Sequence, residues 1–132
     1  MNTKILMISS AFTLGMVGIA LSFLPAEIAQ YLNIGSDAIS ALPLQLLSSL
    51  YLGFAILNWM AKDNLIGGIY SRPVAIGNMT HFIVGALALI KMVTNIQSHR
   101  EIVIALTVIY AIFGICYGYV FMTTPSQVGS KK

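Results

Sequence analysis

The stretch NWMAKDNLIGGIYSRP, residues 58–73, separates two long apolar runs and decides how the chain folds. It holds the only Trp of the sequence, two cations and the Gly67–Gly68 pair. Glycine pairs favour tight turns because they accept backbone angles that other residues avoid. A polar link of this kind between two apolar runs predicts a helical hairpin, with the turn at Gly67–Gly68 and the link outside the membrane.

Composition places the chain among integral membrane proteins. Of its 132 residues, 58% are hydrophobic and 8% are charged, and the mean hydropathy is +0.87. Soluble domains carry about 25% charged residues. The net charge of +3 comes from cations scattered singly or in one terminal pair, so the sequence has no basic stripe. Nucleic acid is therefore not expected as a partner, and membrane lipid is.

Working outward from the link, we count four apolar runs. A membrane-spanning helix needs about 20 predominantly apolar residues. The runs that satisfy this lie at about residues 5–24, 42–60, 73–90 and 102–122. The sequence therefore predicts an all-α protein in which one domain, residues 1–132, forms a four-helix transmembrane bundle.

The segment between the first two runs predicts a short helix at the membrane interface. Pro25 suits the first turn of a helix, and the helical period then puts Ile28, Tyr31 and Leu32 on one apolar face. Ser40 is predicted to cap the next helix, because a serine hydroxyl accepts hydrogen bonds from the free N–H groups of the first turn.

Each run carries small residues at spacings that let helices approach closely. Helix association in lipid depends on such packing, because the surrounding chains are as apolar as the helices. The pairs are Ala11 with Gly15, Ser49 with Gly53, Gly77 with Gly85, and Gly114 with Gly118. They predict helix contacts, either within the chain or with another subunit.

The distribution of cations predicts the orientation, because loops rich in Lys and Arg stay in the cytoplasm. In a four-span chain, one side carries only Lys91 and Arg100. The other side carries Lys4, Lys62, Arg72, Lys131 and Lys132. Both termini and the 58–73 link are therefore predicted to be cytoplasmic.

The same link provides candidate contacts with the membrane surface. Trp and Tyr side chains favour the membrane–water interface, so Trp59 and Tyr70 are predicted to anchor the link there. Lys62 and Arg72 are predicted to contact anionic lipid headgroups.

The ionisable residues argue against several mechanisms. The acids fall outside the predicted spans, which disfavours a carrier coupled to protons or sodium; they are Glu27, Asp37, Asp63 and Glu101. His81 and His99 are predicted to lie too far apart to share a metal, and Cys116 has no second cysteine to pair with. Zinc-protease, phosphate-loop and nucleophile-elbow motifs are missing. No catalytic residue, metal or cofactor is therefore assigned.

Polar residues recur on single faces of the second and third runs. Tyr51 and Asn58 lie seven apart, and Asn78 and His81 three apart, so each pair shares a helix face. At a rise of about 1.5 Å per residue from the link, Tyr51 and His81 reach the same depth. If the two faces meet, they form a polar column. The fourth run adds a wall from Thr107, Tyr110, Gly114 and Tyr117.

Two interpretations of this column remain open. Asn, His and Tyr side chains can simply hydrogen-bond between helices, at about 0.6 kcal/mol per bond. Alternatively, the column binds the polar group of a lipid or quinone, or passes a small solute, since an ionisable residue within a span favours a function. The residues predicted for such a site are Tyr51, Asn58, Asn78, His81, Tyr110 and Tyr117.

The run LYLGFAILNWMA, residues 50–61, and the link IGGIYSRP, residues 66–73, resemble small bacterial membrane proteins of the DoxX-like group. The resemblance implies a four-helix bundle in a bacterial inner membrane, as an accessory to a larger complex. It brings no catalytic residues with it.

The sequence thus favours a small membrane protein without enzymatic activity. Such a protein would bind a lipid-like or quinone-like hydrophobic molecule, or serve as a subunit of a homo-oligomer or a larger membrane complex. The alternative is a channel or facilitator that uses the column around His81. An enzyme acting on a lipid-soluble substrate ranks third.

Overall fold

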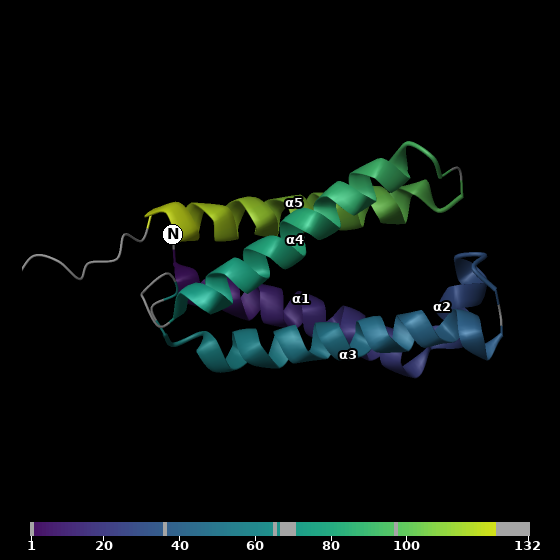
Figure 1. Cartoon of the computed structure of the whole chain (residues 1–132), viewed down its shortest axis with the longest axis horizontal. Helices are drawn as coiled ribbons and strands as arrows, with labels where there is room; N and C mark the ends of the chain where they lie inside the picture. Colours follow the sequence, from purple (N-terminus) through teal and green to yellow (C-terminus); the bar gives the residue numbers. More distant parts are fainter. Residues whose placement is uncertain (1, 36, 65, 67–70, 97, 124–132) are drawn as a thin grey trace, which may run out of the picture. The chain divides into compact units, whose positions relative to one another are not determined.

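The computed structural model describes residues 2–35, 37–64, 66, 71–96 and 98–123. Within these ranges the chain forms five helices: α1 (Thr3–Phe23), α2 (Pro25–Tyr31), α3 (Ala38–Ala61), α4 (Arg72–Val93) and α5 (Arg100–Thr123) (Figure 1). All except α2 are long and apolar enough to cross a membrane. The predicted all-α class, with four long apolar helices and a short helix after the first, is confirmed.

The chain divides into two compact units, each built on one pair of long helices. The α1–α3 unit comprises Met7–Met60, and the α4–α5 unit comprises Met1–Leu6 with Ala61–Lys132. The prediction that the whole chain forms one domain stays a prediction.

In the α1–α3 unit, the two long helices run antiparallel and approach each other at glycines of α1. A Cβ placed at Gly15 would lie 3.7 Å from the Cβ of Ala55, which is an ordinary contact. A Cβ placed at Gly18 would lie only 2.9 Å from Cγ of Leu52. The hydroxyl of Ser48 also donates a hydrogen bond to the carbonyl of Gly18, at 3.0 Å. The absence of a side chain at position 18 therefore sets how closely the backbones approach.

The short helix α2 begins with Pro25 in its first turn and ends in a hydrogen-bonded turn. Asn33 adopts a left-handed conformation with φ of 57°, which Asn tolerates better than most residues. Its N–H donates to the carbonyl of Gln30, and the N–H of Ile34 donates to the carbonyl of Ala29, both at 3.0 Å. This pattern is a Schellman motif, which satisfies the last carbonyls of the helix and ends it.

Helix α3 begins at Ala38, before the predicted start at residue 42, and the prediction of Ser40 as its cap is wrong. Asp37 holds that position. Its carbonyl accepts from the N–H of Ala41 at 3.2 Å, and its carboxylate accepts from the Ser40 hydroxyl. The Ser40 hydroxyl, with further hydrogen bonds from the backbone, holds the pKa of Asp37 below its usual value. A charged carboxylate is a stronger acceptor than a hydroxyl, so the helix starts earlier.

The α4–α5 unit has an aromatic core. The ring of Phe82 in α4 is fully buried. It lies against Tyr110, Phe113 and Tyr117 of α5, at ring-centroid distances of 5.2, 4.9 and 5.8 Å. Gly85 leaves room for this packing, because a Cβ at that position would lie 2.5 Å from the ring of Tyr110. Aromatic pairs in such geometry add about 0.5–1.5 kcal/mol beyond the area they bury.

The predicted small-residue pairs do not all face a neighbouring helix. A Cβ at Gly114 would lie 3.1 Å from Cγ1 of Ile83, so this part of α5 packs on α4. Among the described residues, no atom outside the adjoining stretch of the same helix lies within 4 Å of a Cβ placed at Gly53 or Gly118. The spacing of small residues therefore indicates a smooth helix face, and the contact that the face makes depends on how the helix is rotated.

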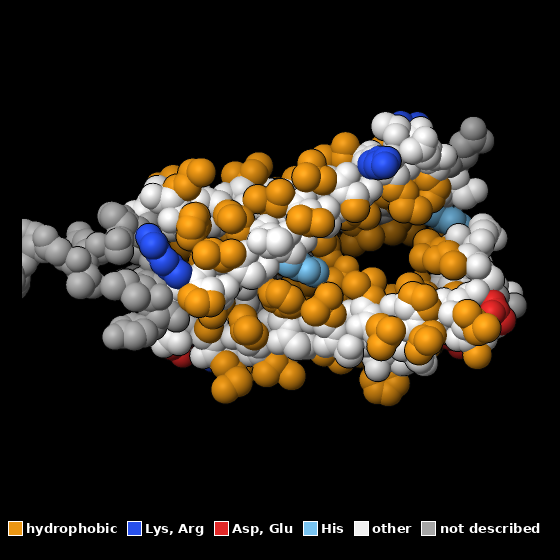
Figure 2. All heavy atoms as spheres, in the orientation of Figure 1, with side chains coloured by type: hydrophobic (Ala, Val, Ile, Leu, Met, Phe, Trp, Pro, Cys, Tyr) orange, Lys and Arg blue, Asp and Glu red, His pale blue; other side chains and the backbone are white. Residues whose placement is uncertain are grey.

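The surface of the helices suits a membrane. Figure 2 shows hydrophobic side chains along the helices, with Lys and Arg side chains near the helix ends on the visible face. Glu27 lies in the first turn of α2, outside the four long helices as predicted. Glu101 lies in the first turn of α5, because this helix begins at Arg100 and not at the predicted residue 102. A carboxylate is stabilised at this position by the positive N-terminus of the helix.

Candidate functional site

His81 lies near the middle of α4, next to Tyr110 of α5. The distance from Nε2 of His81 to the hydroxyl oxygen of Tyr110 is 3.5 Å, and the ring centroids lie 5.6 Å apart. Such a distance is at the long end for a hydrogen bond. His81 is half-buried and Tyr110 is buried. The pair is thus a weak polar contact within an apolar helix pair, at membrane depth.

Neighbouring rings hold this pair in place. Phe82 meets His81 edge-on, with centroids 5.1 Å apart and planes at 77°. It meets Tyr110 in the same way, at 5.2 Å and 72°. Tyr117, which the sequence placed among the site candidates, stacks almost parallel on Phe82 at 9° and is fully buried. Tyr117 therefore supports the core behind the His81–Tyr110 pair.

Asn58 of α3 takes part in a buried hydrogen-bond chain with α1. Its side-chain amide donates to the hydroxyl of Ser10 at 3.0 Å, and Ser10 in turn donates to the carbonyl of Met7 at 3.1 Å. Asn58 and Ser10 are both fully buried. A buried amide left without a partner would cost about 1–3 kcal/mol, so this chain of bonds stabilises the helix pair.

The remaining two members of the predicted column are placed as follows. Asn78 is fully buried, and its amide donates to the carbonyl of Val74 in its own helix at 2.9 Å. Tyr51 is half-buried on α3. Tyr51 and Asn58 belong to the α1–α3 unit, whereas Asn78 and His81 belong to the α4–α5 unit. The polar column that would join all four stays a prediction.

Charged residues gather where the link leaves α3. The ammonium of Lys4 lies 2.6 Å from one carboxylate oxygen of Asp63, and that of Lys62 lies 3.8 Å from the other. The side chains of Lys4 and Asp63 are 55% and 63% exposed, so this ion pair contributes little to stability. The contact does show that the first turn of α1 lies beside Asp63, two residues after the end of α3.

The other predicted interface residues are only partly described. Trp59 is 54% exposed near the end of α3, as an interface anchor would be. The guanidinium carbon of Arg72 lies 5.7 Å from the ring centroid of Phe121, within reach of a cation–π contact. Tyr70 and the Gly67–Gly68 turn lie outside the described residues.

We expect the side chain of Asp63 to titrate below its ordinary pKa of about 3.9. The hydrogen bond from Lys4 is the largest cause of this lowering. A pKa lower in the folded than in the unfolded chain stabilises the fold above the unfolded value, and this contribution is lost as the pH falls through the folded value. The ion pair should therefore be intact at neutral pH and still be present at the ordinary carboxyl pKa of about 3.9, and it should be lost only at more acidic pH.

Titration of the Asp63 carboxyl carbon by NMR in micelles measures this effect. In Lys4→Gln the pKa of Asp63 should rise toward the ordinary value. The pKa of Asp37 depends on Ser40 instead, so it serves as an internal control and should not move. An unchanged Asp63 in Lys4→Gln contradicts the assigned ion pair.

The four long helices define the class of this chain, which is a multi-pass membrane protein. Comparison with protein-family models, with curated proteins and with solved structures finds no match. Within the described ranges, no three His, Cys, Asp or Glu side chains lie close enough together to hold a metal ion.

Sequence reasoning missed two residues that position the site. Ser10 is a single hydroxyl in an apolar run, and nothing in its spacing distinguishes it from Ser9. Phe82 follows His81 directly, but an aromatic residue in a membrane helix carries no local signal of the core it joins. A pairing signal did exist for Lys4 and Asp63, because both fall at the predicted cytoplasmic end of their segments.

Proposed function

We propose that this chain is a small membrane protein, without enzymatic activity, that binds a quinone-like or lipid-like molecule beside His81 and Tyr110. The observation that carries the proposal is the 3.5 Å contact between these two side chains at the middle of an apolar helix pair. We further propose a kinship with DoxX-like proteins, location in a bacterial inner membrane and cytoplasmic termini. The cation distribution supports that orientation.

The chemistry of the pair suits a ligand with a carbonyl or hydroxyl group. A neutral imidazole presents one donor and one acceptor, and a phenol presents a hydroxyl that does both. Because the 3.5 Å contact between them is long, exchanging it for a shorter bond to a ligand oxygen costs little. The surrounding apolar side chains would accommodate a hydrophobic ring or tail. The pair would therefore recognise the polar end of a molecule that partitions into the membrane.

His81→Ala should weaken the binding of a quinone probe, decylubiquinone, about tenfold, which corresponds to one lost hydrogen bond of about 1.4 kcal/mol. Binding is measured by equilibrium titration of the full chain in detergent micelles, with quinone absorbance as the readout. His99→Ala is the matched control, because His99 lies between α4 and α5, outside both helices. Equal affinity in the wild type and His81→Ala, or equal losses in both variants, would contradict the proposed site.

A second candidate is a role as an accessory subunit. It is favoured by the smooth faces of α3 and α5, where no described atom outside the adjoining stretch of the same helix lies within 4 Å of a Cβ at Gly53 or Gly118. Cysteine cross-linking in native membranes, with Gly53→Cys and Gly118→Cys, tests this candidate. Cross-linked products of one defined larger mass support assembly, and monomer alone in both variants contradicts it.

Conduction through the column is less well supported. The amides of Asn58 and Asn78 both bind groups within their own units, which suits helix packing. Flux of a small solute into vesicles, lost in His81→Ala, would favour the conduction alternative instead.

A further inference from the structure

An apolar groove runs along one face of the α1–α3 unit, and neither His81 nor Tyr110 is among its lining residues. It has a volume of about 610 Å³, within the range of ligand pockets. Its floor is made of small residues where the two helices touch, namely Ala11, Gly15 and Ala55. Larger side chains rise on both sides as rims: Phe12, Met16 and Ile19 from α1, and Ile56 and Trp59 from α3.

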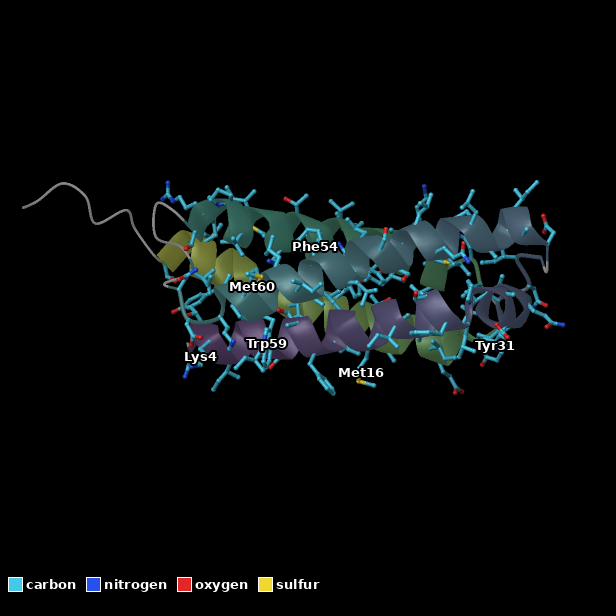
Figure 3. The ribbon with its side chains drawn as sticks, turned by 90° about the horizontal axis from the view of Figure 1, so that it is seen from below. Lys4, Met16, Tyr31, Phe54, Trp59 and Met60 are labelled. Atoms are coloured by element: carbon cyan, nitrogen blue, oxygen red, sulfur yellow. The ribbon has the colours of Figure 1, made fainter. Side chains whose placement is uncertain are left out.

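The two ends of the groove differ in polarity. The lining side chains that carry a hydrogen-bonding group are Ser9 and Trp59, with a hydroxyl and an indole N–H. Both lie toward the end of the unit where α1 begins and α3 finishes, and Figure 3 shows Trp59 there with Met16 further along α1. The opposite end, at Ile19 and Leu52, is wholly apolar. The groove thus carries its hydrogen-bonding side chains at one end and is lined by hydrocarbon elsewhere.

The length of the groove matches one leaflet of a bilayer. From Ile8 to Ile19 the rise along α1 is about 16 Å, and half of a hydrocarbon core about 30 Å thick is about 15 Å. The indole of Trp59 would place the Ser9 and Trp59 end of the groove at the level of the lipid headgroups, because Trp favours that level. A linear chain that starts at the interface and reaches the midplane would fill the groove from end to end.

We propose that this groove holds one acyl chain of a membrane phospholipid. The ester carbonyl lies at the Ser9 and Trp59 end, and the hydrocarbon chain lies over the small-residue floor. A partner helix fits less well, because a helix is about 10 Å wide with its side chains and would have to displace the rims. Three rim side chains already stand out from the surface, since Phe12, Met16 and Ile56 are 69%, 59% and 60% exposed.

The only Trp of the chain lies in this groove and provides a direct readout. The full chain in dodecylmaltoside micelles is titrated with a phosphatidylcholine whose acyl chain carries two bromines, which quench indole emission on contact. We expect saturable quenching of Trp59. Gly15→Leu covers the floor and should raise the half-saturating lipid concentration at least about tenfold. Gly53→Leu adds the same side chain to α3 at a position that does not line the groove and has no described atom of a neighbouring helix within 4 Å, and it should leave that concentration unchanged.

A second pair of variants covers the case in which Gly15→Leu does not fold. Phe12→Ala and Ile56→Ala each remove an exposed side chain from a rim of the groove and should weaken quenching. Leu46→Ala removes an exposed side chain of α3 that does not line the groove and should leave quenching unchanged. Quenching that never saturates in the wild type overturns the proposal, as does quenching that is unchanged in Gly15→Leu and in both rim variants.

Displacement of the phospholipid by oleate at equal concentration would overturn the choice of a phospholipid. His81→Ala should leave this quenching intact, because His81 does not line the groove, so failure here and failure of the quinone site are separate results.

Discussion

Phe82→Ala should lower the free energy of unfolding of the α4–α5 helix pair by about 3 kcal/mol, the lower end of the range for deleting a buried aromatic ring. The ring is 0% exposed and touches the rings of His81, Tyr110, Phe113 and Tyr117. When α4 and α5 separate in a membrane or micelle, acyl chains surround the Phe82 ring, so it does not enter water. The loss of stability in Phe82→Ala therefore comes from lost packing contacts and from the cavity left in the folded state.

The measurement is unfolding of the purified chain in mixed micelles by a denaturing detergent, followed by circular dichroism. Leu87→Ala is the control, because Leu87 lies on the same helix with 61% of its surface exposed and should change stability by less than about 0.5 kcal/mol. Equal losses in the two variants would show that the aromatic cluster does not hold the helix pair. The quinone affinity of Phe82→Ala should also fall, because the ring fixes both His81 and Tyr110.

The helices of this protein could be predicted from sequence because each one is marked by a continuous run of apolar residues. A run of about 20 apolar residues has few alternatives to a membrane-spanning helix, since every backbone group must be hydrogen-bonded within the segment. The ends were harder to place. Asp37 starts α3 ahead of the hydrophobic run, because a capping carboxylate extends the helix into residues that hydropathy does not mark.

The candidate site could be predicted only residue by residue. His81 and Tyr110 each stood out as polar residues in apolar runs, but their contact depends on how α4 and α5 are rotated. That rotation is set by packing, where Gly85 accepts the ring of Tyr110 and Gly114 accepts Ile83. Likewise, the polarity of Asn58 was visible, but its partner Ser10 lies 48 positions earlier in sequence. Helical spacing shows which residues share a face of one helix, but it does not show which residues of another helix pack against that face.

Gly18 shows again that the sequence does not say which small residue a neighbouring helix meets, and here the difference can be measured as a change in stability. The predicted contact pair in α1 was Ala11 with Gly15, yet Gly15 has room for a methyl group and Gly18 does not. Gly18→Ala places its Cβ 2.9 Å from Cγ of Leu52 and 3.2 Å from the Leu52 backbone nitrogen. A backbone atom cannot move aside as a side-chain tip can, so α1 and α3 must separate locally. The separation also strains the 3.0 Å hydrogen bond from Ser48 to the Gly18 carbonyl.

Gly18→Ala should therefore destabilise the α1–α3 unit by about 2 kcal/mol, within the range for overpacking, despite its better helix propensity. Gly15→Ala is the matched control: it gains the same propensity, about 1 kcal/mol, and meets Ala55 at an ordinary 3.7 Å. The difference between the two variants, measured by denaturing-detergent titration, isolates the cost of the clash. If Gly18→Ala is as stable as Gly15→Ala, then α1 and α3 do not approach at position 18, and the close packing assigned to this helix pair is wrong.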